Sequence, residues 1–178
     1  GNSAALNKNG TIIVTGAFQS NDNKGLVFVR KHGTSNNGTR DYDDWVPLGQ
    51  DIIFNEQKKS GYSVAINDDG NRIVFSCSEK PDIFVYEYNI DTSQWDQMYH
   101  LEMENNADHI VSMSGDGNRF SVSSLFDSTV KVYEYTDSSW SQYGLTVRDS
   151  GSNNGNETYA TLSRDGTTLA AWYETTNT

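Results

Sequence analysis

The chain has 178 residues, a single cysteine and a net charge of −11 at pH 7. This length is sufficient for one domain with a buried core, and a single cysteine excludes an internal disulfide framework. The acidity argues against nucleic acid and anionic membrane surfaces as partners, because both require a basic stripe. No apolar run approaches the length of a membrane span, so membrane insertion is not expected either.

The composition favours short strands over helices. Ser, Thr, Asn, Asp and Gly are abundant, and long runs of the helix formers Ala, Leu, Glu and Lys are missing. Small polar residues and glycine are typical of turns, whereas β-branched and aromatic residues favour strands. Because the apolar residues cluster in runs of period two, we expect a folded all-β chain and not a disordered one.

One short motif occurs four times along the chain. It consists of an alternating strand, an Asp-Gly or Asn-Gly turn and a second strand, and the glycine supplies the positive φ that a tight hairpin needs. The motif covers residues 3–14, 62–75, 110–122 and 159–171. Its turn glycines, which are 60, 47 and 49 residues apart, are Gly10, Gly70, Gly117 and Gly166.

Each of the first three copies is followed by two further candidate strands. The third strands span residues 26–30, 83–88 and 130–135, and the fourth strands start at Trp45, Trp95 and Trp140. Four short strands per repeat, at a period of about 50 residues, predict the blade of a β-propeller.

The sequence therefore predicts an all-β fold, namely a β-propeller segment of about three and a half four-stranded blades in one domain over residues 1–178. The expected repeats cover residues 1–60, 61–107, 108–157 and, incompletely, 158–178. A fourth repeat with only its first hairpin leaves a sheet edge unpaired. We therefore expect a longer polypeptide or a larger assembly, with other protein subunits or further blades of the same polypeptide as partners.

The repeat alignment also predicts a buried apolar core. A blade is covered on both faces by its neighbours, so the central residues of its strands are shielded from water. The expected core positions are Val64, Ile66, Ile73, Val85, Val111, Met113 and Val132.

The first repeat is longer than the others at residues 19–25 and 32–44, which we expect to be loops. Loops carry function in propellers, although tolerated insertion at an exposed tip explains the extra length equally well. The second insertion ends in Asp41, Asp43 and Asp44, a candidate interaction loop. These carboxylates could bind calcium weakly, and a solvated run of charges is the alternative.

The repeat resembles a known class of propeller sequences. Ser-Val-Ala-Ile-Asn-Asp-Asp-Gly-Asn at residues 63–71, Phe-Val-Tyr-Glu-Tyr at residues 84–88 and then Trp95 resemble tandem β-propeller repeats of large predicted cell-surface proteins of algae and bacteria. The resemblance covers the whole chain. It implies a scaffolding or binding role without a set chemistry, at the cell surface or outside the cell.

Other propeller classes share the architecture without their diagnostic motifs here. A WD40 repeat combines Trp-Asp with Gly-His, but Trp95-Asp96 occurs without Gly-His. The sialidase Asp-box has one residue between its Asp and Gly, whereas Asp69 and Gly70 are adjacent. The FG-GAP calcium loop has several spaced Asp residues, and Asn21-Asp-Asn has too few oxygen ligands.

No residue pattern points to catalysis, to a metal or to another cofactor. His32, His100 and His109 share no spacing that would predict a zinc site. Glu87 and Glu134 occupy the same station in successive repeats, which indicates structural repetition and not a catalytic pair. We therefore expect a protein that is not an enzyme.

The repeated Trp45, Trp95 and Trp140 have two interpretations. We expect them to seal the outer strand of each blade. If they are exposed, they could stack on sugar rings, which would suit a lectin-like propeller. Cys77 lies in a predicted second strand without a partner base, so we expect a small buried hydrophobe.

Three sequons make Asn9, Asn37 and Asn156 candidate glycosylation sites, which agrees with an extracellular or cell-surface location, although a chain so rich in Asn, Ser and Thr would contain about this many by chance. Together these features predict a non-catalytic structural or interaction scaffold module that belongs to a larger extracellular or cell-surface protein or assembly. The alternative is a lectin-like propeller that binds glycans through its loops.

Overall fold

The structure is a computed structural model that describes residues 2–36, 41–56, 58–103, 107–148 and 157–174. The elements of this part of the chain are fourteen strands and one short helical segment. They are β1 (Ser3–Leu6), β2 (Ile12–Gly16), α1 (Ser20–Asn23), β3 (Val27–Asn36), β4 (Asp41–Pro47), β5 (Ser60–Ile66), β6 (Arg72–Cys77), β7 (Ile83–Asn89), β8 (Gln94–Leu101), β9 (His109–Met113), β10 (Arg119–Ser124), β11 (Thr129–Thr136), β12 (Ser139–Arg148), β13 (Glu157–Leu162) and β14 (Leu169–Glu174).

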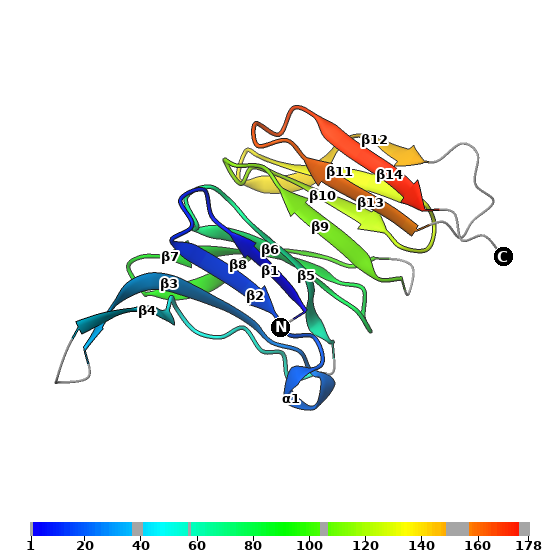
Figure 1. The fold of residues 1–178 in the computed structure, drawn as a ribbon. Helices are drawn as coiled ribbons and strands as arrows, with labels where there is room; N and C mark the ends of the chain where they lie inside the picture. Colours follow the sequence, from blue (N-terminus) through cyan, green and yellow to red (C-terminus); the bar gives the residue numbers. More distant parts are fainter. Residues whose placement is uncertain (1, 37–40, 57, 104–106, 149–156, 175–178) are drawn as a thin grey trace.

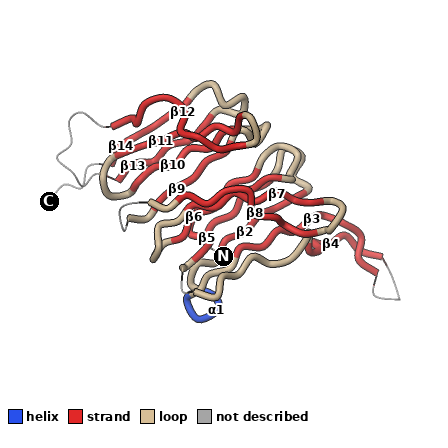
Figure 2. The backbone as a smooth tube through the Cα atoms, turned by 180° about the vertical axis from the view of Figure 1, so that it is seen from behind, coloured by secondary structure: helices blue, strands red, loops and turns tan. Residues whose placement is uncertain are grey.

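The strands form four antiparallel sheets in chain order (Figure 1). The first three sheets, β1–β4, β5–β8 and β9–β12, have four strands each, and the fourth has only β13 and β14 within the described residues. The first strands of successive sheets lie side by side. Seen from behind in Figure 2, the sheets follow one another like the blades of a fan. This is the predicted fold, an all-β segment of a β-propeller.

Backbone hydrogen bonds join the first turns of successive sheets. The N–H of Lys8 donates to the carbonyl of Asp68 (3.3 Å), and that of Asp68 donates to Gly115 (2.8 Å). The N–H of Gly115 donates in turn to the carbonyl of Arg164 (2.6 Å). One chain of hydrogen bonds therefore runs through all four sheets and sets their spacing at the inner edge.

The predicted turns form, and a side chain at the end of the first strand closes them. Asn67 Oδ1 accepts hydrogen bonds from the N–H groups of Asn71 (3.0 Å) and Arg72 (2.9 Å), and Asn7 closes the first turn in the same way. Gly70 has φ +75°, a left-handed conformation that glycine adopts at little steric cost. The Asn-to-Gly spacing of the motif is thus explained by the turn.

Two apolar cores lie between neighbouring sheets, one between the first and second sheets and one between the second and third. The sequence-based core prediction is confirmed. Five of the predicted positions are buried and the last two are half-buried: Val64, Ile73, Val85, Val111, Met113, Ile66 and Val132.

Small polar residues take the place of apolar ones where the inner strands of the second and third sheets meet. Ser76 Oγ donates to the carbonyl of His109 (2.7 Å), and Ser63 Oγ accepts from the N–H of Val111 (3.1 Å). All four residues belong to the second and third sheets. Serine therefore satisfies backbone groups of the neighbouring sheet that a larger apolar side chain would leave unpaired.

The two insertions of the first sheet are not the simple loops that the sequence predicted. Residues 20–23 form α1, in which Asn21, Asp22 and Asn23 have φ of 54°, 55° and 64°. Asn and Asp tolerate this left-handed conformation better than other non-glycine residues.

Most of the second insertion continues strands β3 and β4, which pair from His32–Trp45 to Asn36–Asp41. The result is a hairpin that projects from the sheet (Figure 1). The prediction of a loop over residues 32–44 was therefore wrong. Alternation in this polar stretch was weak, and cross-strand hydrogen bonding needs no apolar residues.

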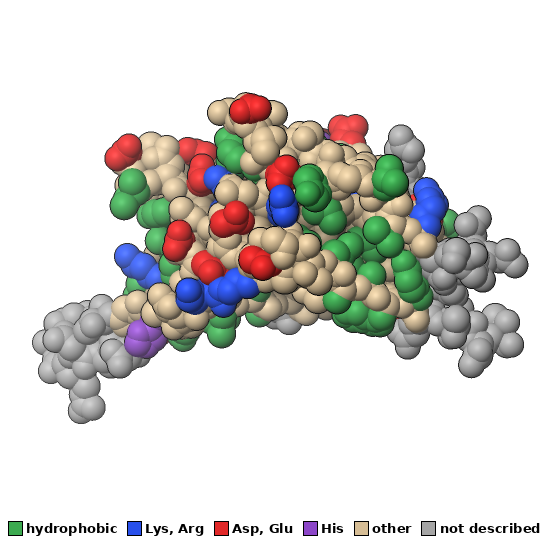
Figure 3. Space-filling view, turned by 90° about the horizontal axis from the view of Figure 1, so that it is seen from above, with side chains coloured by type: hydrophobic (Ala, Val, Ile, Leu, Met, Phe, Trp, Pro, Cys, Tyr) green, Lys and Arg blue, Asp and Glu red, His purple; other side chains and the backbone are tan. Residues whose placement is uncertain are grey.

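Large apolar side chains are exposed on the outer strands of the third and fourth sheets. We call this set the open face, and it consists of Tyr143 (49% exposed), Leu145 (90%), Val147 (41%) and Trp172 (53%). Hydrophobic side chains gather on the right of Figure 3, the half of the molecule that holds these two sheets. The first three residues lie on β12 and the last on β14.

Candidate functional site

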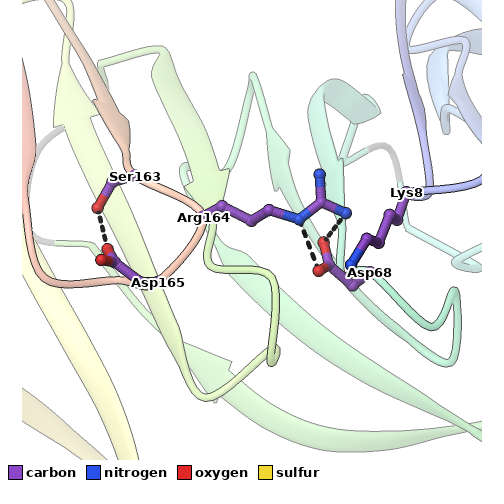
Figure 4. Close-up of a pocket in the computed structure, with 5 residues that line it drawn as sticks. All are labelled: Lys8, Asp68, Ser163, Arg164 and Asp165. Carbon is purple, nitrogen blue, oxygen red and sulfur yellow. Dashed lines mark hydrogen bonds and ion pairs between the residues drawn. The ribbon is translucent and has the colours of Figure 1, made fainter.

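A cavity of about 410 Å³ opens at the inner turns of the first, second and fourth sheets. Its charged lining residues are Lys8, Asp68, Arg164 and Asp165 (Figure 4). Arg164 reaches past the turn of the third sheet and holds Asp68 with two contacts, from Nε to Oδ2 (2.7 Å) and from Nη2 to Oδ1 (2.7 Å). This bidentate pair links the second sheet to the fourth.

The second carboxylate of the cavity is also occupied by its own turn. Asp165 Oδ1 accepts hydrogen bonds from Ser163 Oγ (2.6 Å) and from the N–H (3.0 Å) and hydroxyl (2.8 Å) of Thr167. The bond from Ser163 and those from Thr167 lower the pKa of Asp165 to about 2. Such a carboxylate stays ionised at neutral pH and is unsuited to act as a general acid or base. The cavity therefore offers mixed surface charge for contact.

A second cavity, of about 440 Å³, lies beside the second sheet and is centred on the largely buried Asp82. Lys58 Nζ contacts Asp82 Oδ2 at 2.6 Å, and His100 Nε2 lies 3.3 Å from Oδ1 without hydrogen-bond geometry. Phe84 packs against both partners, stacked on the His100 ring at 4.5 Å and lying 5.2 Å from Lys58 Nζ. Lys58 thus compensates the charge of Asp82, and the aromatic contacts hold the cluster in one arrangement.

Cys77 lies near this cluster, but its thiol is not activated as a nucleophile. It is fully buried, as predicted, and its N–H donates to the carbonyl of Asp82 (2.9 Å). Burial raises the pKa of the thiol, and the charge of Asp82 raises it further. The reactive thiolate is therefore disfavoured, and Cys77 serves as a small apolar residue of the first core.

Two arginines that the sequence analysis overlooked join successive sheets, and we call them the arginine clamps. Arg72 Nη2 donates to Glu87 Oε1 (2.7 Å), while its Nη1 donates to the carbonyl of Gly117 in the next sheet (3.0 Å). Arg119 repeats this arrangement one sheet later.

Arg119 Nη2 donates to Glu134 Oε1 (2.6 Å), and its Nη1 donates to the carbonyl of Gly166 (2.8 Å). Glu87 and Glu134 are therefore partners of the clamps, which agrees with the predicted structural repetition. The shared Gly-Asn-Arg sequence of both turns was the signal that could have identified the arginines.

The three repeated tryptophans differ in burial. Trp95 and Trp140 are buried against the preceding sheet, and Trp95 Nε1 donates to the carbonyl of Leu48 (2.7 Å). Trp45 is 40% exposed and forms a T-shaped pair with His32, with ring centroids 5.5 Å apart. Trp95 and Trp140 fit the predicted sealing role, but Trp45 has no earlier sheet against it in the described chain.

Among the other predicted site residues, the structure describes the side chains of Asn9 and Asp44. Asn9 is exposed in the first turn, while Asn37 and Asn156 lie outside the described residues. Asp44 is exposed on β4, where its Oδ1 accepts from the N–H of Trp45 (2.7 Å); the side chains of Asp41 and Asp43 lie outside the described part. Glycosylation and the acidic interaction surface stay predictions.

The described residues contain no group of three His, Cys, Asp or Glu side chains that could hold a metal ion. His32, His100 and His109 lie on β3, β8 and β9. Neither ring nitrogen of the fully buried His109 has a hydrogen-bond partner among the described residues, and burial lowers the pKa of the ring. Over the same described ranges, no helix is long and apolar enough to cross a membrane.

No family model and no curated protein matches the chain. Solved structures do share its fold. The β-propeller domain of Myceliophteria thermophila Cps50 (Swd1) is 12% identical with a TM-score of 0.59, and the match covers 95% of this chain and 49% of that one. KlAtg21, solved in complex with the coiled-coil of AgAtg16, is 9% identical with a TM-score of 0.58, over 96% and 50%.

A third similar structure is that of a Bacteroides fragilis protein provisionally described as a 6-phosphogluconolactonase. It is 10% identical with a TM-score of 0.55, and the match covers 82% of this chain and 38% of that one. The chain thus spans half or less of the length of these propellers. At such low identities the similarity establishes the β-propeller fold and leaves function to be argued from the residues.

Proposed function

We propose that the chain is a non-catalytic scaffold module that binds other polypeptides as part of a larger extracellular or cell-surface assembly. The observation that carries the proposal is the open face, where Tyr143, Leu145, Val147 and Trp172 expose apolar surface on adjacent sheets. Three of these residues lie within residues 143–147 of β12, and exposed apolar surface concentrated in this way marks protein interaction sites.

The use of the charged residues supports the same proposal. Arg72, Arg119 and Lys58 are engaged in ion pairs that hold sheets or connections together, and Asp165 is held by its own turn. A catalytic site needs a titratable group that is free to exchange a proton or attack a substrate. The structural partners of these groups favour a scaffold over an enzyme, although the fold itself occurs in both.

One of the similar propellers agrees with a role in assembly. KlAtg21 was solved with a coiled-coil of another protein, and propellers present large surfaces to partners through their exposed strands and loops. The extracellular location rests on the sequence alone, through the sequons and the resemblance to surface-protein repeats.

Sedimentation velocity of the 178-residue chain over a range of concentrations tests the proposal. We expect concentration-dependent association that Leu145→Lys reduces, because a charge in the apolar contact is costly to desolvate. Ile90→Lys is the matched control, since Ile90 is exposed on the turn between β7 and β8, away from the open face. A monodisperse monomer at every concentration, with identical behaviour of both variants, would contradict the proposal.

The lectin-like alternative is supported by exposed indole surface at Trp45 and Trp172. Trp172 is stacked on Tyr159 with ring centroids 5.4 Å apart, so one of its faces is already covered. A glycan array probed with the chain, and with Trp45→Ala and Trp172→Ala, separates the alternatives. Saturable binding to a glycan that either variant abolishes would favour the lectin.

A further inference from the structure

The fourth sheet has a free edge along β14. Within the described residues, β14 pairs with β13 alone. The N–H of Ser163 donates to the carbonyl of Thr168, so Thr168 faces β13. Since antiparallel partners alternate along a strand, the backbone groups of Leu169 and Ala171 face the open edge. A strand with such an edge is a template for pairing with another strand.

The third sheet has one face toward the second sheet and one toward the fourth. The face toward the fourth sheet is the one that a four-stranded fourth sheet would cover. Glu134 lies on this face, because its partner Arg119 reaches the carbonyl of Gly166 in the fourth sheet. Val132 lies on the same face, two residues before Glu134 on β11, and it pairs with Tyr143. Tyr143 therefore points to the side on which the third and fourth strands of a fourth sheet would lie.

The second sheet has a tyrosine at the position equivalent to Tyr143, and there the next sheet has all four strands. Val85 pairs with Tyr99 there, as Val132 pairs with Tyr143 in the third sheet. The ring of Tyr99 lies 6.5 Å from that of Phe120 on β10 and 6.2 Å from that of Trp140 on β12. A fourth strand that carries an aromatic residue thus covers Tyr99. Within the described residues no aromatic ring of a neighbouring sheet covers Tyr143, whose ring has the guanidinium of Arg119 4.4 Å from its centroid.

The opposite end of the molecule is built differently. The second sheet packs Phe75, Tyr86 and Tyr88 into the core that it shares with the first sheet. At the equivalent positions of the first sheet, three polar residues lie on its outer face. They are Thr15, Arg30 and His32, as the strand pairing shows. Arg30 Nη1 also contacts Asp51 Oδ1 at 3.1 Å. The same face also has apolar residues, because Ile13, Phe28 and Trp45 occupy the stations of Ile73, Phe84 and Trp95. What distinguishes the end formed by β12 and β14 is the edge of β14, which pairs with β13 alone within the described residues.

We propose that this end binds a β-hairpin of a partner polypeptide that carries the same repeat. The first strand of the hairpin pairs with β14 in antiparallel fashion, and its second strand places an aromatic residue over Tyr143. A two-stranded segment fits because the edge of β14 offers backbone pairing and Tyr143, beside it on β12, offers an apolar contact for a second strand. The inference rests on the proposed scaffold function and names the structural class of the partner.

The probe is a head-to-tail cyclised peptide with the sequence of residues 129–148, which form β11 and β12. In the third sheet the N–H of Tyr135 donates to the carbonyl of Asn118, the contact that the peptide should reproduce at the β14 edge. Binding to the 178-residue chain is measured by fluorescence anisotropy. We expect saturable binding that N-methylation of the peptide at Tyr135 weakens roughly tenfold or more, because that change removes one edge hydrogen bond and blocks close approach.

Changes in the chain test the two parts of the surface separately. Ala171→Pro removes an edge N–H and Tyr143→Lys places a charge in the apolar contact, so each should weaken peptide binding, whereas Ile90→Lys should not. If Ala171→Pro does not fold, as judged by its melting transition, the N-methylated peptide and Tyr143→Lys still decide the matter. The inference would be overturned if the peptide does not bind, or if it binds equally well to the native chain and to the Ala171→Pro and Tyr143→Lys variants.

The outcome is distinguishable from that of the sedimentation experiment. If the chain self-associates through Leu145 but the peptide neither binds nor competes, the open face is an assembly surface and its occupant is a second copy, not a repeat hairpin. If the peptide binds at the edge, the proposed occupant stands whatever the chain does alone.

Discussion

Single arginines join blade to blade in this protein. The guanidinium of Arg72 contacts Glu87 on its own sheet and also reaches Gly117 and Asn118 on the next sheet. Its planar fork of donors suits this bridging role, which a lysine ammonium would fill less well. Because the side chain is mostly buried, its partners cannot recover these hydrogen bonds from water at low cost.

We expect Arg72→Met to lower the free energy of unfolding by about 2 kcal/mol, since a charged hydrogen-bonded group is lost from a mostly buried site. Arg30→Met is the matched control. Arg30 contacts Asp51 in a more exposed pair at 3.1 Å, for which a loss below about 1 kcal/mol is expected. Urea denaturation of both variants checks this. Equal losses would show that the contact to the next sheet adds no stability.

His109 should make stability depend on pH. Burial lowers its pKa in the folded chain, although the charges of Asp127 and Asp108 partly oppose the effect. The unfolded chain therefore binds more protons just below the ordinary histidine pKa of about 6.5, and stability present above that pH is lost as the pH falls toward the folded pKa. Asp165, with its pKa of about 2, titrates well below this range.

The measurement is the free energy of unfolding between pH 7.5 and 5. We expect it to decrease in the native chain and to decrease less in His109→Leu, which has no proton to bind. Parallel pH profiles for the two proteins would contradict the assignment to His109.

The element that repeats is the hairpin, and its turn glycines serve two purposes. Each has positive φ, but only some lie against a neighbouring sheet. A Cβ on Gly70 would lie 2.5 Å from Ile12 Cδ1 of the first sheet, whereas a Cβ on Gly10 would meet nothing within 4 Å. The same turn is therefore a simple hairpin at one end of the chain and part of an inter-sheet contact further on.

Gly10→Ala and Gly70→Ala separate these purposes. We expect Gly10→Ala to cost about 1 kcal/mol, because alanine resists positive φ, and Gly70→Ala to cost at least about 2 kcal/mol because Ile12 must also move. Thermal and urea denaturation measure both. The prediction fails if the two variants lose the same stability.

On the scale of the whole molecule, no tightly bound ion is expected. The described sheets are held by backbone pairing, apolar cores and arginine clamps, none of which involves a metal. We expect a chelator to leave the thermal midpoint unchanged within about 1 °C, since a ligand that binds only the folded state would have raised it. A large fall on chelation would direct attention to Asp41, Asp43 and Asp44.

The sequence by itself determined the repeat, the turns and the alternation of strands. These are local properties, because the period of two and the positive φ of Gly70 or Gly117 depend on near neighbours in the chain. Most core positions followed, since residues such as Ile73 and Val85 repeat at equivalent stations. The extended β3–β4 hairpin could not be predicted from the sequence, because its polar residues do not show the alternation of apolar and polar residues that identifies a strand.

Only the tertiary structure decided which residues serve as contacts between sheets. Arg119 and Gly166 are far apart in the chain, and although the repeated Gly-Asn-Arg sequence marks the arginine, it does not indicate which carbonyl the guanidinium meets. The same is true of exposure: Trp45 and Trp140 are equivalent in sequence, yet Trp140 is buried because a sheet precedes it. Burial at a blade face depends on the neighbouring blade, so the repeat predicts the station while the arrangement of sheets determines which faces stay open.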